Sequence, residues 1–466
     1  MNIQQAYQDA KKEYDDVKAK LERFDELSIK TELSVAERKD ERSPESDAKR
    51  RRQEIFEHYP PEAPSARATP SNFARLQGNF EKDHPILHCG RPLWTSIVPI
   101  TLLHPIFRSF LQKLETYEPM SVDNAFVLDL SNSMSKWYEH ERFRAAAFHG
   151  HALANNYPYL ITGCKNEIGN SGADAYLQGG LYYYEFMHKL SLDAPASTLP
   201  CLHIFYFGAF FGFTGSAISK NGVHLEVLLP VYLVIWHLYD TIMQTWTARV
   251  FGAFMWTVNK LRSYYEHGRH KPLWKGTFVS LPNTNFLYKH EYAVDNATMN
   301  FKYTKQHSSG KLIFFGETTA GDVICIKYTR SYSAAAHRYL ASLGVALRLC
   351  GFEQLPHKWY MVVMDMMDQA YLPYSHQTKD KISFPSIEVL RHRVEEVVNT
   401  FHEQNFVHGD LRDTNLFVQK NGEGKFMLID FDWSGMAGED HDLDMLEIMF
   451  GRSEQPEVNH HPSEVD

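Results

Sequence analysis

The stretch Phe406–Trp433, FVHGDLRDTNLFVQKNGEGKFMLIDFDW, decides how the second half of this chain folds. An apolar segment leads into His408–Asp410, and Asn415 stands just before a short apolar segment. The turn sequence Asn-Gly-Glu-Gly at 421–424 and a second apolar segment then bring the chain to Asp430–Asp432. Two apolar segments joined by such a turn predict a β-hairpin, so the polar residues beside it are expected at one edge of an apolar sheet.

The order of these polar residues, H-x-D-x-x-x-x-N followed by D-F, resembles the catalytic loop and the metal-binding segment of the protein-kinase superfamily. The resemblance implies that Asp410 accepts or orients the proton of an attacking hydroxyl. It also implies that Asn415 and Asp430 hold Mg2+ against the phosphates of ATP. Phosphoryl transfer needs positioning and charge neutralisation, for which oxygen ligands around one metal suffice. A lone aspartate could equally cap a surface turn, but the joint spacing favours the kinase-like interpretation.

Two upstream segments extend the resemblance to the nucleotide site. The apolar strand Val323–Lys327 is similar to the V-A-I-K strand, which implies that Lys327 contacts the α- and β-phosphates of the nucleotide. The segment Tyr360–Met367 resembles the strand that enters the hinge between kinase lobes. The main chain from Asp365 to Met367 is therefore expected to meet the adenine edge.

The helix expected over 333–341 departs from the protein-kinase pattern because it contains no acidic residue. Typical protein kinases place a glutamate there to hold the strand lysine. His337 is the polar residue at a suitable place, and a neutral imidazole is a poor substitute for a carboxylate. Lys327 is therefore expected either to be held by Asp430 alone or to belong to a weak nucleotide site.

Other departures concern the phosphates and the acceptor. The glycines at 310, 316 and 321 form no G-x-G-x-x-G motif, so no glycine ligand is assigned. Gly409 stands where signalling kinases carry an arginine, and no A-P-E follows Asp432. The sequence His-Gly-Asp also resembles enzymes that phosphorylate aminoglycosides and choline. Both a protein and a small-molecule acceptor remain open.

The middle of the chain resembles the PD-(D/E)XK nuclease-type domain that is fused to kinase-like domains in fungal proteins related to the Crinkler effectors. The resemblance rests on Ser121–Phe126, Lys165–Gly169 and Gln178-x-x-x-Tyr182. It implies carboxylates that bind a divalent metal and a lysine that positions water. The glutamate of Glu-x-Lys would fall on Gly163, so we expect a degenerate nuclease. The candidate substitute ligands are Glu139, Glu141, Glu167 and Asp174.

Hydrophobic patterning predicts further elements in this middle region. Two apolar patches, Leu202–Ile218 and Val223–Tyr239, flank a Ser-Lys-Asn-Gly turn. Their glycines, together with Glu226 and Pro230, favour a buried hairpin over membrane spans. The globular region starts with the apolar stretch Leu102–Leu114. The other expected elements are a strand at Tyr159–Thr162 and helices at Ser133–Ala154, Gln178–Leu190 and Tyr232–Glu266.

The predicted fold class is α+β, with five consecutive segments. A two-lobed protein-kinase-like domain at the C-terminal side is preceded by a restriction-endonuclease-like α/β domain and a charged helical extension. The segments are the extension 1–58, a proline-rich linker 59–84, the degenerate nuclease-like domain 85–270, the kinase-like domain 271–455 and a disordered tail 456–466.

Composition excludes several classes of protein. A net charge of -9 gives no global reason to expect nucleic-acid binding. The five cysteines are scattered singly, so no zinc site or disulfide framework is indicated. The polar N-terminus does not read as a signal peptide, and the chain is expected to be intracellular, either cytoplasmic or nuclear. Lys49–Arg52 is a candidate nuclear-import patch or an ordinary basic helix surface.

Three functions follow from these patterns. The first is an ATP- and Mg2+-dependent phosphotransferase of the protein-kinase-like superfamily, with a protein or small-molecule acceptor. The second is a pseudokinase with a dead nuclease, which would act as an interaction or effector module. The third is a metal-dependent nuclease.

Overall fold

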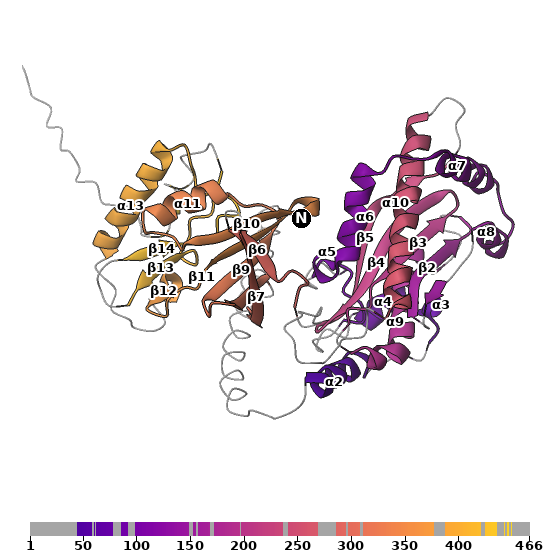
Figure 1. Cartoon of the computed structure of the whole chain (residues 1–466), viewed down its shortest axis with the longest axis horizontal. Coiled ribbons are helices and arrows are strands. Elements are labelled where there is room, and N and C mark those ends of the chain that lie inside the picture. The colour runs from indigo at the N-terminus through magenta and orange to yellow at the C-terminus, as the bar shows by residue number, and fades with distance from the viewer. Residues whose placement is uncertain are drawn as a thin grey trace, which may run out of the picture. The chain divides into compact units, whose positions relative to one another are not determined.

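The computed structural model describes residues 44–57, 60, 62–77, 85–91, 98–148, 152–154, 157–167, 172–195, 197–235, 241–268, 286–294, 297–307, 311–376, 387–420, 425–435, 442, 445–446 and 449. The chain divides into two compact units. Unit 1 is Met1–Lys289 with His307–Lys311, and unit 2 is His290–Gln306 with Leu312–Asp466. Each unit has its own sheet and helices (Figure 1). The expected tail 456–466 and most of the expected extension lie outside the described residues.

Unit 1 is built on a five-stranded mixed sheet in the order β1-β2-β3-β4-β5. The pair β2–β3 is parallel and the other neighbours are antiparallel. Parallel neighbours need a crossover connection, and α9 (Ala175–Leu190) supplies it between β2 and β3. The strands are β1 (Ala152–Ala154), β2 (Tyr157–Lys165), β3 (Cys201–Phe207), β4 (Phe210–Ser219) and β5 (Gly222–Leu233).

Helices cover both faces of this sheet, which explains why β3 and β4 are almost entirely buried. Phe205 of β3 contacts Tyr176 of α9, with ring centroids 5.9 Å apart. On the opposite face, Phe213 of β4 packs against Phe254 of α10 (Thr241–Glu266), with ring centroids 4.9 Å apart. The remaining helices are α2 (Pro44–Phe56), α3 (Pro64–Arg67), α4 (Pro70–Gln77), α5 (Ile100–Leu103), α6 (Pro105–Thr116), α7 (Ser121–Met134), α8 (Glu141–Ala147) and the 3-10 turn Ser191–Asp193.

The proline-rich segment expected as a linker instead contains α3 and α4. Pro64 and Pro70 each occupy the first position of a helix, where a missing N–H costs nothing. Arg67 and Phe73 are buried, so these helices belong to the core of unit 1.

The single helix expected over Ser133–Ala154 is wrong. The chain leaves α7 at Met134, forms α8, and then enters β1. The buried Arg144 explains the break, because its guanidinium donates to the carbonyl oxygens of Met134 and Lys136, each at 3.2 Å. Tyr138 also donates to the Ser133 carbonyl at 2.9 Å, which closes the end of α7.

The apolar patches fold as three strands. The first patch forms β3 and β4, which turn at Gly208 with a φ of +59°. The predicted hairpin around Ser219–Gly222 is confirmed as β4–β5. The long helix begins at Thr241 rather than Tyr232, because Tyr232 still pairs with Phe211 in the sheet. None of the described helices combines the length and apolar character that a membrane span requires.

Unit 2 contains an antiparallel six-stranded sheet in the order β10-β11-β9-β8-β7-β6 and a three-stranded sheet β12-β13-β14. The strand predicted at Val323–Lys327 is confirmed as β9. The polar-rich β6 and β7 were not expected. The elements are β6 (Glu291–Val294), β7 (Ala297–Gln306), β8 (Ile313–Thr318), β9 (Val323–Thr329), α11 (Ala334–Ser342), β10 (Leu349–Leu355), β11 (Trp359–Asp365), β12 (Tyr371–Pro373), α13 (Ile387–Glu403), β13 (Leu416–Gln419), β14 (Phe426–Leu428) and the 3-10 turns Pro356–Lys358 and Tyr374–His376.

One apolar core joins α11, α13 and the β13–β14 hairpin. Leu340, Val394 and Leu416 are fully buried in it. Because the hairpin is anchored on this core, the polar residues that flank its strands are held in fixed positions.

Candidate functional site

The predicted hairpin is present and places two candidate metal ligands side by side. Leu416 pairs with Leu428, and the Ile429 N–H donates to the Asn415 carbonyl at 3.0 Å. Asn415 therefore lies directly opposite the residue that precedes Asp430. Asp430 has a φ of +72°, a backbone conformation that costs a non-glycine residue about 1 kcal/mol or more. Such strain is typical of residues whose direction matters for function.

Asn415 also fixes the candidate base. Its Nδ2 donates to the main-chain oxygen of Asp410 at 2.8 Å and to Asp410 Oδ2 at 2.9 Å. Arg412 adds an ion pair to Asp410 Oδ2 at 2.8 Å. Because both hydrogens of the Asn415 amide are engaged, the direction of its Oδ1 is fixed, and that oxygen remains available as a ligand.

A buried carboxylate, that of Asp442, accepts hydrogen bonds from the backbone of the catalytic loop. Asp442 is fully buried and accepts the N–H groups of His408 at 2.6 Å and Gly409 at 2.9 Å. His402 Nε2 lies 3.2 Å from the same carboxylate. Asp442 was not predicted as a site residue, because it stands among several acidic residues and no local signal marks which of them is buried.

The glycine in His-Gly-Asp has a structural cause. Gly409 has a φ of +74°, and a Cβ there would lie 2.6 Å from the carbonyl oxygen of Trp433. The strand-like bridge between Val407 and Gly435 brings that main chain close, with N–H to O distances of 3.0 and 3.2 Å. The arginine of signalling kinases would therefore not fit at this position without a change of backbone.

Lys327 is held by two carboxylates. Its Nζ forms an ion pair with Asp430 Oδ1 and lies 2.7 Å from Asp432 Oδ1. The lysine sits on β9 between Ile313 and Val362 and is 8% exposed, so little water screens these charges. Burial raises the pKa of Asp432, and Lys327 opposes that shift. Of the two alternatives predicted for Lys327, pairing with Asp430 alone is wrong, because the second aspartate of Asp-Phe-Asp shares the role. The alternative of a weak nucleotide site stays a prediction.

His337 does not take the place of the missing glutamate. Its Nδ1 pairs with the Tyr332 hydroxyl and its Nε2 with the Leu347 carbonyl, both at 2.7 Å. The ring stacks on Phe431, with centroids 4.6 Å apart and planes 12° apart. Burial lowers the pKa of His337 to about 4, so the ring is neutral at pH 7. It packs behind the site rather than facing the lysine.

In the predicted hinge, Asp365 is already hydrogen-bonded, whereas the main-chain groups of Met366 and Met367 are available to a ligand. Asp365 ends β11, its N–H donates to the Arg348 carbonyl at 3.1 Å, and its carboxylate pairs with the Arg348 guanidinium at 2.9 Å. The main-chain groups of Met366 and Met367 make no hydrogen bond to any described residue. The free edge of the hinge thus lies at Met367, while Asp365 is engaged with Arg348.

The donor set suits a hard cation. Within the described residues, no three His, Cys, Asp or Glu side chains gather to hold a metal. The available donors are the amide oxygen of Asn415 and the carboxylates of Asp430 and Asp432. These are all oxygens, which Mg2+ prefers, and Mg2+ commonly takes its remaining ligands from water and phosphate. The residues therefore fit a metal that binds together with a nucleotide.

In unit 1, the residues of the nuclease-like motif contact different partners and do not gather around one point. Lys165, at the end of β2, lies 3.6 Å from Glu141 Oε2, and Glu167 forms an ion pair with the buried Arg144. Asp174 caps α9 by accepting N–H groups, the shorter at 2.8 Å. Of the remaining residues named for this site, Glu139 has an 82% exposed side chain, and Gln178 Nε2 donates to the Tyr182 hydroxyl at 3.3 Å.

Comparison with known proteins supports the kinase-like interpretation. A family model of the ABC1 atypical kinase-like domain matches residues 357–456, which include the catalytic loop, the hairpin and Asp442. The second unit contains a kinase-like domain. No curated protein matches this chain.

Among solved structures, the kinase PK-1 of Cydia pomonella granulovirus is similar, with 14% identity and a TM-score of 0.25. The match covers 30% of this chain and 55% of the viral kinase, so the chain spans about half of that relative's length. The comparisons give no support for the nuclease resemblance or for an origin among fungal Crinkler-type proteins.

Proposed function

We propose that this protein is an ATP- and Mg2+-dependent phosphotransferase that acts on an alcohol group of a protein or a small molecule. The observation that carries the proposal is one chain of contacts. It runs from Lys327 through Asp430 to the hairpin, and from Asn415 to the carboxylate of Asp410. Each role that phosphoryl transfer requires is thus assigned to a side chain in a connected site.

Asp410 is the proposed base. Contacts from Asn415 and Arg412 fix its carboxylate, so one oxygen is held while the other can accept the proton of the attacking hydroxyl. The metal, when bound through Asn415 and Asp430, would neutralise phosphate charge. The Met367 main chain is the proposed adenine contact, and Asp365 supports the hinge through Arg348.

Asp432 is the proposed substitute for the missing helix glutamate. Lys327 must leave Asp430 when that carboxylate binds a metal, and it needs a second carboxylate to stay oriented toward the phosphates. Asp432 lies 2.7 Å from its Nζ and meets that need. The lysine can therefore remain paired throughout nucleotide binding.

Nucleotide-dependent thermal stabilisation tests the proposal. We expect millimolar ATP with Mg2+ to raise the melting temperature of the wild-type chain, and Asp430→Ala to abolish the Mg2+-dependent part of the shift. Absence of any shift in the wild type would remove the proposed function. A control titration with Mg2+ alone separates metal binding from nucleotide binding.

A nucleotide-binding module without turnover is the second candidate. The observation in its favour is that α11 presents no carboxylate to Lys327, whose charge instead neutralises the candidate metal ligand Asp430. This candidate predicts ATP binding without transfer or hydrolysis. Equal background activity of the wild type and Asp410→Asn would favour it.

A further inference from the structure

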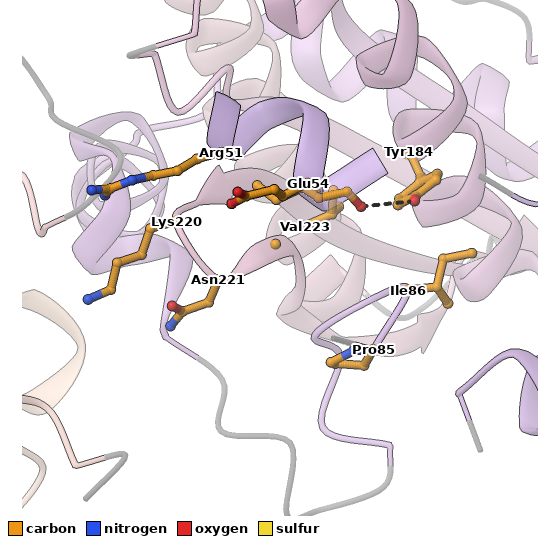
Figure 2. Close-up of a pocket in the computed structure, with 10 residues that line it drawn as sticks. Arg51, Glu54, Pro85, Ile86, Tyr184, Lys220, Asn221 and Val223 are labelled. Atoms are coloured by element: carbon orange, nitrogen blue, oxygen red, sulfur yellow. Dashed lines mark hydrogen bonds between the residues drawn. The ribbon is translucent and has the colours of Figure 1, made fainter. Parts of the chain in front are cut away.

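A cavity of about 40 Å3 in unit 1 is lined by charged groups of both signs (Figure 2). Arg51 and Lys220 line it together with Glu54. Because cationic and anionic groups share this small space, its lining favours no single class of ligand. A more selective arrangement surrounds Lys327 in unit 2.

The ring of Tyr332 lies close to the ammonium group of Lys327. The Nζ atom is 5.8 Å from the ring centroid, within the range of a cation–π interaction. Tyr332 belongs to the connection between β9 and α11 and is half-buried against the apolar core of unit 2. This connection therefore brings an electron-rich ring to the lysine, just before the helix that contains no acidic residue.

His337 of α11 holds this ring in place. Its Nε2 lies 2.7 Å from the Leu347 carbonyl oxygen, which can only accept, so Nε2 carries the hydrogen. In the neutral imidazole Nδ1 is then an acceptor, and the Tyr332 hydroxyl donates to it at 2.7 Å. Burial lowers the pKa of His337 to about 4 and raises the pKa of Tyr332, so both groups keep these roles at pH 7.

The same imidazole also contacts the Asp-Phe-Asp segment. It stacks on Phe431, whose ring meets that of Tyr332 edge-on, with centroids 6.2 Å apart and planes at 75°. Phe352 stacks on Tyr332 with centroids 6.0 Å apart, and the Ser333 N–H donates to the Phe431 carbonyl oxygen at 3.1 Å. One network of contacts thus fixes both the ring beside the lysine and the segment that carries its two carboxylate partners.

We propose that Tyr332 is a second positioning residue for Lys327, beside Asp432, and acts from the α11 side. The direction of Lys327 toward nucleotide phosphates rests on the proposed function. Asp430 and Asp432 are both oxygen donors that Mg2+ can engage. A neutral phenol ring does not compete for such a metal, and its attraction for a cation persists while the lysine donates hydrogen bonds to phosphate. The ring therefore stays with the lysine even when both carboxylates turn to the metal.

Two substitutions at Tyr332 test this role. Tyr332→Leu removes the ring, whereas Tyr332→Phe keeps the ring and loses only the hydroxyl. We expect Tyr332→Leu to weaken the binding of ATP with Mg2+ by at least about fivefold, and Tyr332→Phe to retain it within about twofold. Calorimetric titration of the full chain measures both affinities.

Tyr339→Leu is the matched control. Tyr339 is also half-buried against the same core and stacks on Phe401 with centroids 6.1 Å apart, but no contact among the described residues joins it to Lys327. It should lower the melting temperature through lost packing and leave the ATP affinity within about twofold of the wild-type value. Equal losses of affinity in Tyr339→Leu and Tyr332→Leu would overturn the positioning role.

Acetylation of Lys327 in the nucleotide-free chain tests the contact independently of ATP. An N-hydroxysuccinimide ester of acetate labels accessible amines, and mass spectrometry of peptides gives the rate at Lys327. That rate should rise at least about fivefold in Tyr332→Leu, because the amine is no longer held against a ring, and stay within about twofold in Tyr332→Phe.

Equal labelling of Lys327 in the wild type and Tyr332→Leu would overturn the proposal, as would equal increases in the Leu and Phe variants. Equal ATP affinities of the wild type and Tyr332→Leu would overturn it as well. Faster labelling in Tyr332→Leu, combined with no ATP binding by the wild type, would remove the proposed function and support the contact of Tyr332 with Lys327.

Discussion

The two candidate sites start from similar residues and differ in how those residues are connected. Each has a lysine on a buried strand, Lys327 in unit 2 and Lys165 in unit 1, and both lysines are 8% exposed. In unit 2, the lysine, carboxylates and amide contact one another. In unit 1, Glu167 is committed to Arg144, and Asp174 caps a helix. The contrast shows how motif residues should be interpreted. They indicate a functional site when their polar groups contact one another, and a structural role when those groups form hydrogen bonds or ion pairs with other residues.

The largest effect is expected at the candidate base. Asp410→Asn keeps the shape and the Asn415 contact but removes the proton acceptor, so phosphotransfer should fall by about 10²–10⁴-fold. ATP consumption by the purified chain measures this, with the melting temperature as the control for folding. Unchanged turnover in Asp410→Asn would contradict the proposed role of Asp410, and unit 2 would then have no stronger claim to a catalytic site than unit 1.

Gly409→Ala should cost unit 2 about 2–4 kcal/mol of stability, because a Cβ at φ +74° would meet the Trp433 carbonyl oxygen at 2.6 Å. Gly321→Ala is a matched control in the same unit, since Gly321 also has a positive φ, +90°, but nothing lies within 4 Å of its Cβ. That change should cost only about 1 kcal/mol. Urea denaturation compares the two variants, and equal losses would show that the Trp433 contact is not what fixes the glycine.

Asp432→Asn should weaken Mg2+-dependent ATP binding by about tenfold, because Lys327 would then neutralise Asp430 whenever the metal arrives. Asp432→Glu should restore most of the affinity. The ATP affinity with and without Mg2+ distinguishes this role from a structural one, which would lower the melting temperature and leave the metal dependence unchanged.

Acid should destabilise both units through their buried histidines. Burial lowers the pKa of His104 and His203 in unit 1 to about 3, and that of His337 in unit 2 to about 4. Because these folded pKa values lie below the unfolded value of 6.5, the stabilisation is present above pH 6.5. It is lost as pH falls below 6.5 toward the folded pKa, at about 1.4 kcal/mol per pH unit for each histidine.

A replacement at His203 isolates this effect. Both ring nitrogens of His203 are buried without a hydrogen-bond partner among the described residues, so His203→Phe should reduce the slope of stability against pH between 6.5 and 5. Equal slopes in the wild type and His203→Phe would contradict the assignment.

The smallest effect is expected in a nuclease assay. Lys165→Ala and the wild type should both leave a plasmid uncut in Mg2+ or Mn2+, because the candidate carboxylates have other partners. If the wild type cleaved the plasmid and Lys165→Ala did not, unit 1 would have a nuclease site, and the contrast drawn between the two units would be wrong.

Local patterns predicted elements well where the signal was itself local. The β13–β14 hairpin, the β4–β5 hairpin and α9 follow from apolar periodicity and turn residues within a few positions. The prediction of one helix over Ser133–Ala154 was wrong, because Arg144 closes α7 with contacts that periodicity does not reveal. The proline-rich linker prediction missed α3 and α4, because proline favours both a linker and the first turn of a helix.

The sequence by itself determined the kinase-like hairpin and the order of Lys327, Asp410, Asn415 and Asp430, since spacing along the chain encodes both. Only the tertiary structure decided which partners these residues have. Asp432 on Lys327, Asp442 beneath the catalytic loop and His337 behind Phe431 depend on contacts between distant segments. The physical reason is that burial and charge pairing belong to the packed chain: one aspartate among several acquires its role when packing removes its water and supplies its partners.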